Sequence, residues 1–247
     1  MSYRERLYRK YHSISEHRNA SSPLEEKRSK RVYAMIVKRF FPRNKSAKII
    51  DLGCGSGGLV SYAHNDGYKA IEGVDGSEEE VRVALKRGRT NVSLNDITSY
   101  LRGCKDESVD LITSFDVIEH LDREELLNLS VEIFRVLKGR GYWVLHTVNA
   151  ASPFSGDIRY GDLTHEQAFT FTSIKQLALY AGFGTVKIFE SAVPAHGLLS
   201  LVRKVVWKVV VFFFTVAHAA ETGNLSFRLV WTRNLYAVLS KTTKFDV

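Results

Sequence analysis

The sequence has few of the residues that mark disulfide-rich or disordered proteins. It contains only two cysteines, Cys54 and Cys104, and four prolines in 247 residues. Two cysteines are too few for a disulfide framework or a zinc knuckle, and we interpret Cys54 as a small packing residue in a reducing compartment. Little proline and no low-complexity tract argue against long disordered regions.

The sequence also lacks an apolar run long enough to cross a bilayer. The charge-free run at residues 209–220 has 12 residues, whereas a membrane-spanning helix needs about 20. The first residues are too charged for a signal peptide. We therefore expect a cytoplasmic protein.

Acidic residues are scarce at both ends of the chain. Residues 1–48 contain 14 Lys and Arg against four Asp and Glu, and residues 197–247 contain seven against two. Residues 49–196 are acidic, with 14 against 21. Basic ends suit nucleic acid, an anionic membrane surface or a phosphorylated substrate. Because no aromatic-basic RNA signature accompanies them, we do not expect a nucleic-acid partner.

What the sequence does have is a short apolar strand followed by glycines at every second position. Residues 49–52 contain Asp51, and the next apolar run, 70–74, is followed by Asp75. Glycines let the backbone turn sharply from strand to helix and leave room for a ligand. Two carboxylates at adjacent strand tips beside such a turn are typical of a nucleoside pocket. The turn glycines are Gly53, Gly55 and Gly57.

Strands and helices alternate from residue 48 onward, which predicts an α/β fold with a doubly wound, largely parallel sheet. Helices are expected at 123–137, ended by Gly139, and at 173–181, ended by Gly182. The expected strands are 49–52, 70–74, 91–94, 109–115, 142–149, 185–189 and 235–239.

Two further motifs narrow the fold. The strand at 109–115 leads into Asp116-x-x-Glu119-His120, and the phrase 161–166 follows the strand at 142–149. With the glycine turn, these motifs resemble the class I S-adenosylmethionine-dependent methyltransferases from about residue 49 to 183. The resemblance implies a Rossmann-like, seven-stranded sheet with an antiparallel last strand in a three-layer sandwich. A nicotinamide-binding Rossmann domain is the alternative, because the glycines also fit its spacing.

The resemblance assigns roles to the residues that match the family pattern. Asp51 and the turn lie against the methionine part of S-adenosylmethionine, and Asp75 accepts hydrogen bonds from the ribose. Asp96 contacts adenine. Helix capping is the structural alternative for Asp75 and Asp96. The full set of predicted cofactor residues is Asp51, Gly53, Gly55, Gly57, Asp75, Gly76, Ser77, Asp96, Ile97, Ser114 and Phe115.

A hydroxyl acceptor loses a proton as it is methylated, and a positioned histidine or carboxylate can take it. His165 lies in the loop 150–170, which faces the substrate in this fold, so we predict that it is the base. Glu166 is its predicted orienting partner, and His120 is the second candidate. His146 lies within a strand and is interpreted as structural.

Asp116, Glu119 and His120 have the i, i+3, i+4 spacing that could place them on one helix face. Similar Glu-x-x-Glu-His groups occur in 3-demethylubiquinone-type and small-RNA 3′-terminal methyltransferases, where a divalent metal can be involved. This chain has Asp first and only one His. We therefore interpret Glu119 and His120 as shaping the cofactor pocket and predict no metal.

Three phrases, at residues 8–13, 159–169 and 234–238, resemble bacterial methyltransferases from surface-polysaccharide gene clusters. They imply O-methylation of a sugar hydroxyl in O-antigen or capsule, on a carbohydrate or lipid-linked glycan. A quinone-type O-methyltransferase with a lipophilic acceptor is the main alternative, and an RNA methyltransferase is a weaker one. A non-catalytic scaffold is a further alternative, but the intact glycine turn argues against it.

We expect residues 1–47 to form a basic arm and a helix beginning at Ser22, and residues 48–247 to form the methyltransferase domain. Residues 197–222 are expected to form an amphipathic helical insertion, with Lys204 and Lys208 beside an apolar stripe. This pattern suits peripheral docking on the inner membrane. A homodimer interface or a substrate lid would have the same pattern.

Overall fold

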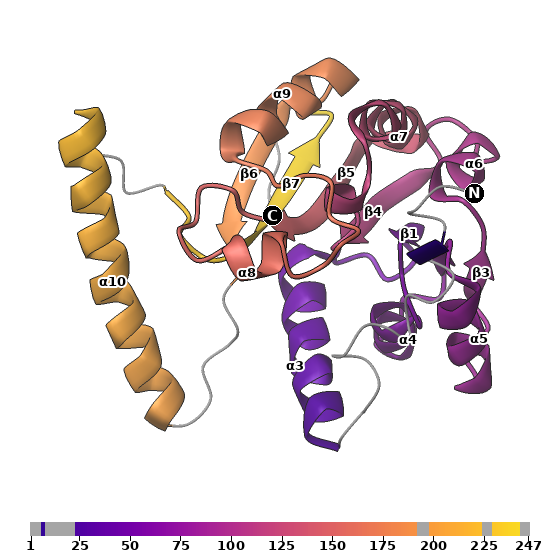
Figure 1. The fold of residues 1–247 in the computed structure, drawn as a ribbon. Helices are drawn as coiled ribbons and strands as arrows, with labels where there is room; N and C mark the ends of the chain where they lie inside the picture. Colours follow the sequence, from indigo (N-terminus) through magenta and orange to yellow (C-terminus); the bar gives the residue numbers. More distant parts are fainter. Residues whose placement is uncertain (1–5, 8–22, 192–197, 224–228, 243–247) are drawn as a thin grey trace.

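The computed structural model describes residues 6–7, 23–191, 198–223 and 229–242, and Figure 1 shows one sheet with helices on both faces. The seven strands have the order β3-β2-β1-β4-β5-β7-β6, and β7 is antiparallel to both of its neighbours. The predicted Rossmann-like sheet with an antiparallel last strand is therefore confirmed. Its strands are β1 (Ile49–Leu52), β2 (Ile71–Asp75), β3 (Val92–Leu94), β4 (Val109–Phe115), β5 (Leu137–Val148), β6 (Thr185–Glu190) and β7 (Asn234–Ser240).

Each face of the sheet is covered by helices, which gives three layers (Figure 1). One buried cluster joins the sheet to α3 (Pro23–Phe40) and α4 (Gly58–Asn65). The cluster on the other face includes the fully buried Trp143 and involves α6 (Ile97–Arg102), α7 (Arg123–Val136) and α9 (Phe171–Ala181). A third, smaller cluster attaches α5 (Glu78–Lys86) to β3.

Two predicted helix boundaries are wrong by one or two residues. Helix α7 ends at Val136, and β5 begins at Leu137 because this residue pairs with Val109 of β4. Helix α9 begins at Phe171 instead of residue 173, because Thr170 caps it and Ser173 reciprocates in a capping box. Helix α9 does end at Gly182, whose φ of 99° requires a left-handed conformation.

The helix α10 (Leu198–Thr222) lies apart from the three layers, at the left of Figure 1. One side of it packs on the domain, where Trp207 contacts Phe154 and Phe214 contacts Trp231. The described helices include none that is long and apolar enough to span a bilayer. Nine large apolar side chains on α10 are 44–88% exposed, namely Leu199, Leu201, Val202, Val205, Val206, Val209, Phe212, Phe213 and Val216.

Some expectations cannot be compared with the structure. The predicted N-terminal arm up to Ser22 lies outside the described residues, apart from residues 6–7, and so does Gly197. The expected helix after Ser22 is observed as α3 from Pro23.

Candidate active site

The turn between β1 and α4 has the conformation that its glycines allow. Gly53, Gly55 and Gly57 have φ angles of 67°, 53° and 71°, in the region that side chains disfavour. A Cβ at Gly53 would also lie 2.3 Å from the Cγ2 atom of Val117. The main-chain N–H of Gly53 donates to the carbonyl of Val74 at 2.8 Å, which ties the turn to β2. The turn therefore brings β1, β2 and the tip of β4 together.

Asp51 is fully buried at the end of β1, where Thr113 of the neighbouring strand donates to its carboxylate at 2.6 Å. The pKa of Asp51 is raised to about 7, mainly by burial; the Thr113 hydroxyl opposes this rise, and the nearby charge of Asp75 adds to it. A buried carboxyl beside a second carboxylate is stabilised when a cation binds. The site therefore suits the ammonium group of the methionine part, which the family resemblance places against Asp51.

Asp75, at the tip of β2, accepts a main-chain hydrogen bond with each of its carboxylate oxygens. One oxygen accepts from the N–H of Gly55 at 2.7 Å, and the other accepts from the N–H of Ser77 at 2.8 Å. The helix cap of α5 is the side chain of Ser77. Asp75 therefore lies between the turn and the start of α5, beside Gly76, in the place predicted for a ribose partner.

Asp96 has a different local role. Its side chain caps α6 by accepting from the N–H of Ser99 at 2.8 Å. This is the capping role that the sequence left open for it. Asp96 and Ile97 nevertheless follow β3 at the same sheet edge as Asp75, because the N–H of Asn95 donates to the carbonyl of Asp75 at 3.1 Å.

Ser114 and Phe115, the two residues at the end of β4 predicted to contact the cofactor, have side chains in different surroundings. Ser114 is buried, and its hydroxyl accepts a hydrogen bond of 2.8 Å from the indole N–H of Trp143. The Ser114 side chain thus belongs to the core, which leaves its main chain for the predicted cofactor contact. The ring of Phe115 packs edge-on against His146 and Tyr236.

The residue after β4, Asp116, has a positive φ of 55°. Among the non-glycine residues that the structure describes, only Glu107 also has a positive φ. The Asp116 carboxylate contacts Nδ1 of His146 at 2.7 Å, and Nε2 of this histidine contacts the Ser191 hydroxyl at 2.8 Å. The imidazole therefore joins the ends of β4 and β6. This arrangement agrees with a structural role for His146.

The helix face expected for Asp116, Glu119 and His120 does not form. Only residues 118–120 are helical, as one 3₁₀ turn (η1, Ile118–His120), because the chain turns at Asp116 with positive φ. Glu119 is buried and accepts from the Thr147 hydroxyl at 2.9 Å. Burial and the charge of Asp116 raise its pKa.

His120 and His165 come together from different loops. Their ring centroids are 4.6 Å apart. Nδ1 of His120 contacts the Thr164 hydroxyl at 2.8 Å, and Nδ1 of His165 contacts the carbonyl of Ile158 at 3.0 Å. The pKa of His120 is lowered to about 4, mainly by burial and also by the neighbouring His165. The two predicted base candidates thus share one site.

Glu166 reaches this site through its main chain. Its N–H donates to the carbonyl of Glu119 at 2.8 Å, and its own carbonyl accepts from Arg159 at 2.6 Å. Arg159 also donates to the carbonyl of His165 at 2.6 Å. These bonds fix the loop that carries His165, and the Ile158 carbonyl orients its ring.

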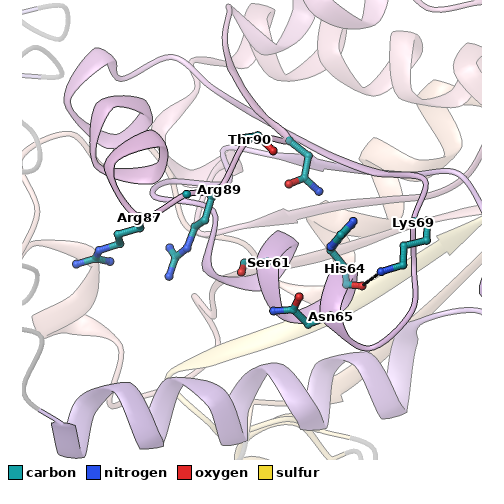
Figure 2. A pocket seen from close by; sticks show the side chains of 9 residues that line it. Ser61, His64, Asn65, Lys69, Arg87, Arg89 and Thr90 are labelled. Carbon is teal, nitrogen blue, oxygen red and sulfur yellow. Dashed lines mark hydrogen bonds between the residues drawn. The ribbon is translucent and has the colours of Figure 1, made fainter.

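A cavity of about 450 Å³ lies elsewhere, between α4 and the loop that joins α5 to β3 (Figure 2). Asn91, on its wall, donates to the carbonyl of Ile71, the first residue of β2, so the cavity lies at the amino edge of the sheet. None of the predicted site residues lines it. Its lining residues are Ser61, His64, Asn65, Lys69, Arg87, Gly88, Arg89, Thr90 and Asn91.

Comparison with known proteins decides between the nucleoside-binding alternatives. Residues 24–188 match a family described as methyltransferase domain, which is more than half of the chain. The chain belongs to the methyltransferase-domain family. It is an S-adenosylmethionine-dependent methyltransferase, and the nicotinamide alternative is excluded.

A curated relative of this methyltransferase is the cyclopropane-fatty-acyl-phospholipid synthase of Escherichia coli strain K12. The two are 29% identical over 105 residues, which is 42% of this chain and 26% of the synthase. The chain therefore matches about a quarter of that relative's length.

Solved structures share the fold of the methyltransferase. A S-adenosylmethionine-dependent methyltransferase from Archaeoglobus fulgidus has a TM-score of 0.63 and 24% identity, over 87% of this chain and 97% of that one. Phosphoethanolamine N-methyltransferase 2 of Haemonchus contortus, in complex with S-adenosylmethionine, has a TM-score of 0.61 and 18% identity, over 98% of this chain and 60% of that one.

The residues at the carboxyl edge of the sheet fit this cofactor. Strand order reverses between β1 and β4, and in open α/β sheets ligands bind in the crevice beside this point. Three of the five residues of the turn are glycines, which leave room for a ligand. Helix α4 begins behind the turn without a side-chain cap, so its amides suit a carboxylate. Asp51 suits the ammonium group, and Asp75 suits a ribose diol.

Several residues of the site were not predicted from the sequence. Thr113 bonds to Asp51, and Thr164 links His120 to Asp162, which accepts the Thr164 hydroxyl at 2.6 Å. Asp162 lies in the phrase 161–166 that the sequence singled out, but no spacing rule connects it to His120. The contact depends on how two loops meet.

Proposed function

We propose that this methyltransferase methylates a sugar hydroxyl on an intermediate of bacterial surface-polysaccharide synthesis. The observation that carries the proposal is the polar character of the acceptor side. His120, Asp162 and His165 lie together beyond the tip of β4. Val117, two residues after β4, packs against the glycine turn. Hydroxyl groups can form hydrogen bonds with all three polar side chains.

His165 has the geometry of a general base. A carbonyl can only accept, so Nδ1 of His165 carries the proton that it donates to Ile158, and the lone pair is on Nε2. When bound, S-adenosylmethionine supplies a methyl group on a sulfonium. The Nε2 lone pair takes the hydroxyl proton as the acceptor oxygen forms its bond to the methyl carbon and the carbon–sulfur bond breaks. Glu166 holds the His165 loop through its main chain, and His120 packs on the ring.

The exposed stripe of α10 supports peripheral docking at an anionic membrane, where lipid-linked glycans are located. Its apolar side chains are bordered by exposed Arg203, Lys204 and Lys208. The only acidic residue in α10 is Glu221, near its end. A second copy of α10 would therefore bring few negative charges to these cations, whereas anionic headgroups would match them.

A lipophilic acceptor is the second candidate. The matched relative is named a fatty-acyl-phospholipid synthase, and the Val- and Phe-rich stripe of α10 could cover an apolar molecule. In this reading α10 is a lid over a quinol or lipid, and the substrate needs no glycan.

The test compares acceptors with purified full-length protein freed of lipid. Synthetic lipid-linked glycans and quinols are incubated with S-adenosylmethionine, and products are analysed by mass spectrometry for an added methyl group. We expect methylated glycan and no methylated quinol. Methylated quinol alone would replace the sugar proposal with the lipophilic one.

His165→Ala tests the proposed base. Loss of a general base lowers turnover by about 10²–10⁴-fold, and binding of S-adenosylmethionine should not change. His64→Ala, in the cavity at the opposite sheet edge, is the matched control and should keep full turnover. Turnover of His165→Ala within about threefold of wild type would show that another group takes the proton.

A further inference from the structure

Three side chains that could bind a metal ion meet next to the proposed acceptor position. His120 comes from the turn after β4, and Asp162 and His165 come from the loop after β5. One ligating atom from each of these residues lies within 4.8 Å of the others. His120 is buried, while Asp162 and His165 are partly exposed. The cluster is therefore fixed on one side and open to solvent on the other.

The hydrogen bonds of this cluster set the tautomer of His120. The Thr164 hydroxyl donates its proton to the carboxylate of Asp162 at 2.6 Å. An ionised carboxylate can only accept, so the Thr164 oxygen must accept from Nδ1 of His120, 2.8 Å away. His120 therefore carries its proton on Nδ1 and its lone pair on Nε2.

His165 has the same tautomer for an independent reason, because its Nδ1 donates to the Ile158 carbonyl. Metal-binding histidines commonly donate one ring N–H to a carbonyl or another acceptor, which fixes the ring and leaves the other nitrogen for the ion. Both imidazoles here have that outer hydrogen bond. Asp162 accepts from the Thr164 N–H and hydroxyl with one oxygen, Oδ1, which fixes its carboxylate in the same way.

We propose that His120, Asp162 and His165 bind a divalent transition-metal ion through two Nε2 atoms and one carboxylate oxygen. Two imidazoles and one carboxylate suit Zn²⁺, Co²⁺, Mn²⁺ or Fe²⁺, whereas Mg²⁺ and Ca²⁺ prefer oxygen ligands. Three protein ligands leave coordination positions for water or an acceptor hydroxyl.

The spacing of the cluster is close to what an ion requires. Ligand atoms held at about 2.0–2.2 Å from one ion lie roughly 3–3.6 Å apart. One ligating atom of each residue already lies within 4.8 Å of the others, so the groups must approach by at most roughly 1–2 Å.

The proposed metal site depends on the proposed function in one respect only, which is that the acceptor binds beside it. An ion and a proton compete for the Nε2 lone pair of His165, so a metal-loaded site cannot use His165 as a base. Metal occupancy would therefore regulate the proposed reaction, and adding Zn²⁺ should lower turnover when His165 is the base.

The experiment measures Zn²⁺ binding to the full chain by equilibrium dialysis and the absorption spectrum of bound Co²⁺. We expect about one ion per chain and at least tenfold weaker binding in Asp162→Asn. Asp157→Asn is the matched control, because Asp157 lies in the same connection between β5 and α9, in the short helix α8 (Gly156–Arg159), and pairs with Arg233 at the surface. His120→Gln tests the buried ligand, with thermal unfolding to verify folding.

Zn²⁺ binding that is absent, or equal in wild type, Asp162→Asn and folded His120→Gln, would overturn the site. Calorimetry with S-adenosylmethionine on the same samples keeps the two proposals separate. Zn²⁺ binding, together with no methylation of any glycan by the metal-free protein, would contradict the proposed function alone. Glycan methylation without Zn²⁺ binding would contradict the metal site alone.

Discussion

At the scale of single residues, the site depends on polar groups placed where water is excluded. Asp51 is near the end of a buried strand, where its carboxylate accepts a hydrogen bond from the Thr113 hydroxyl. Burial favours the neutral carboxyl over the carboxylate. The cost of ionising Asp51 is therefore recovered only when a cation binds beside it.

This predicts that binding of S-adenosylmethionine depends on pH. The pKa of Asp51 is about 7 in the folded protein, so below pH 7 the ammonium group must displace a proton. Affinity should rise with pH from 5.5 to 7 by up to about tenfold per unit. Calorimetry measures this slope, and Asp51→Asn, which cannot ionise, should bind weakly with little slope. A wild-type affinity that is constant over this range would show that Asp51 does not bind the ammonium.

The same raised pKa has a consequence for stability. Between about pH 4 and pH 7 folded Asp51 holds a proton that the unfolded chain has released, so the unfolded state binds fewer protons. The free energy of unfolding therefore falls as pH rises through this range and levels off above it. Glu119, whose pKa is also raised, contributes in the same direction.

A second residue-scale prediction concerns Gly53. Gly53→Ala forces a side chain into a φ of 67° and against Val117, whereas Gly88→Ala meets a similar φ of 71° with no atom within 4 Å. The strained φ costs each variant about 1–2 kcal/mol, and the clash adds about 1–3 kcal/mol at Gly53 alone. The free energies of unfolding of both variants are measured in urea, and the difference between them gives the cost of the clash. Equal losses would show that the β4 tip does not press on the turn.

At the scale of elements, the sequence predicts the sheet well because parallel strands are buried on both faces and appear as apolar runs. One boundary failed because a distant partner decides it: Leu137 joins β5 because it pairs with Val109 of β4. The start of α9 was missed although its signal is local, since Thr170 caps the helix and Ser173, three residues later, reciprocates. The helix face expected for Asp116, Glu119 and His120 failed because local spacing does not reveal a positive φ.

The helix α10 gives the element-scale prediction. Each Lys near an anionic surface contributes about 1 kcal/mol, so Lys204→Glu with Lys208→Glu should weaken flotation with phosphatidylglycerol vesicles by roughly 30-fold or more. Lys86→Glu with Lys105→Glu makes the same charge change on exposed residues elsewhere and is the control. Equal flotation of both double variants, or a stable dimer by ultracentrifugation that the α10 variant abolishes, would contradict membrane docking.

At the scale of the whole molecule, the structure brings the motif residues predicted for the cofactor to one edge of the sheet, whereas the proposed acceptor side also includes residues that the sequence did not predict. Asp51, Asp75 and the turn glycines follow from strand ends that lie side by side in any sheet of this order. The hydrogen bonds from Asp162 through Thr164 to His120 join two loops that are about 42 residues apart in the sequence. The spacing of residues along the sequence does not reveal these contacts. His146 was assigned to structure, and its contacts with Asp116 and Ser191 explain what it holds together.

The position of the bound nucleoside decides whether Asp51, Asp75 and His165 have the roles proposed for them. A crystal structure of the full chain with S-adenosylhomocysteine tests this directly. We predict the ribose hydroxyls on Asp75, the amino group beside Asp51, and the sulfur facing the tip of β4 and His165. A ligand seated in the cavity of Figure 2, or a ribose with no contact to Asp75, would contradict the account.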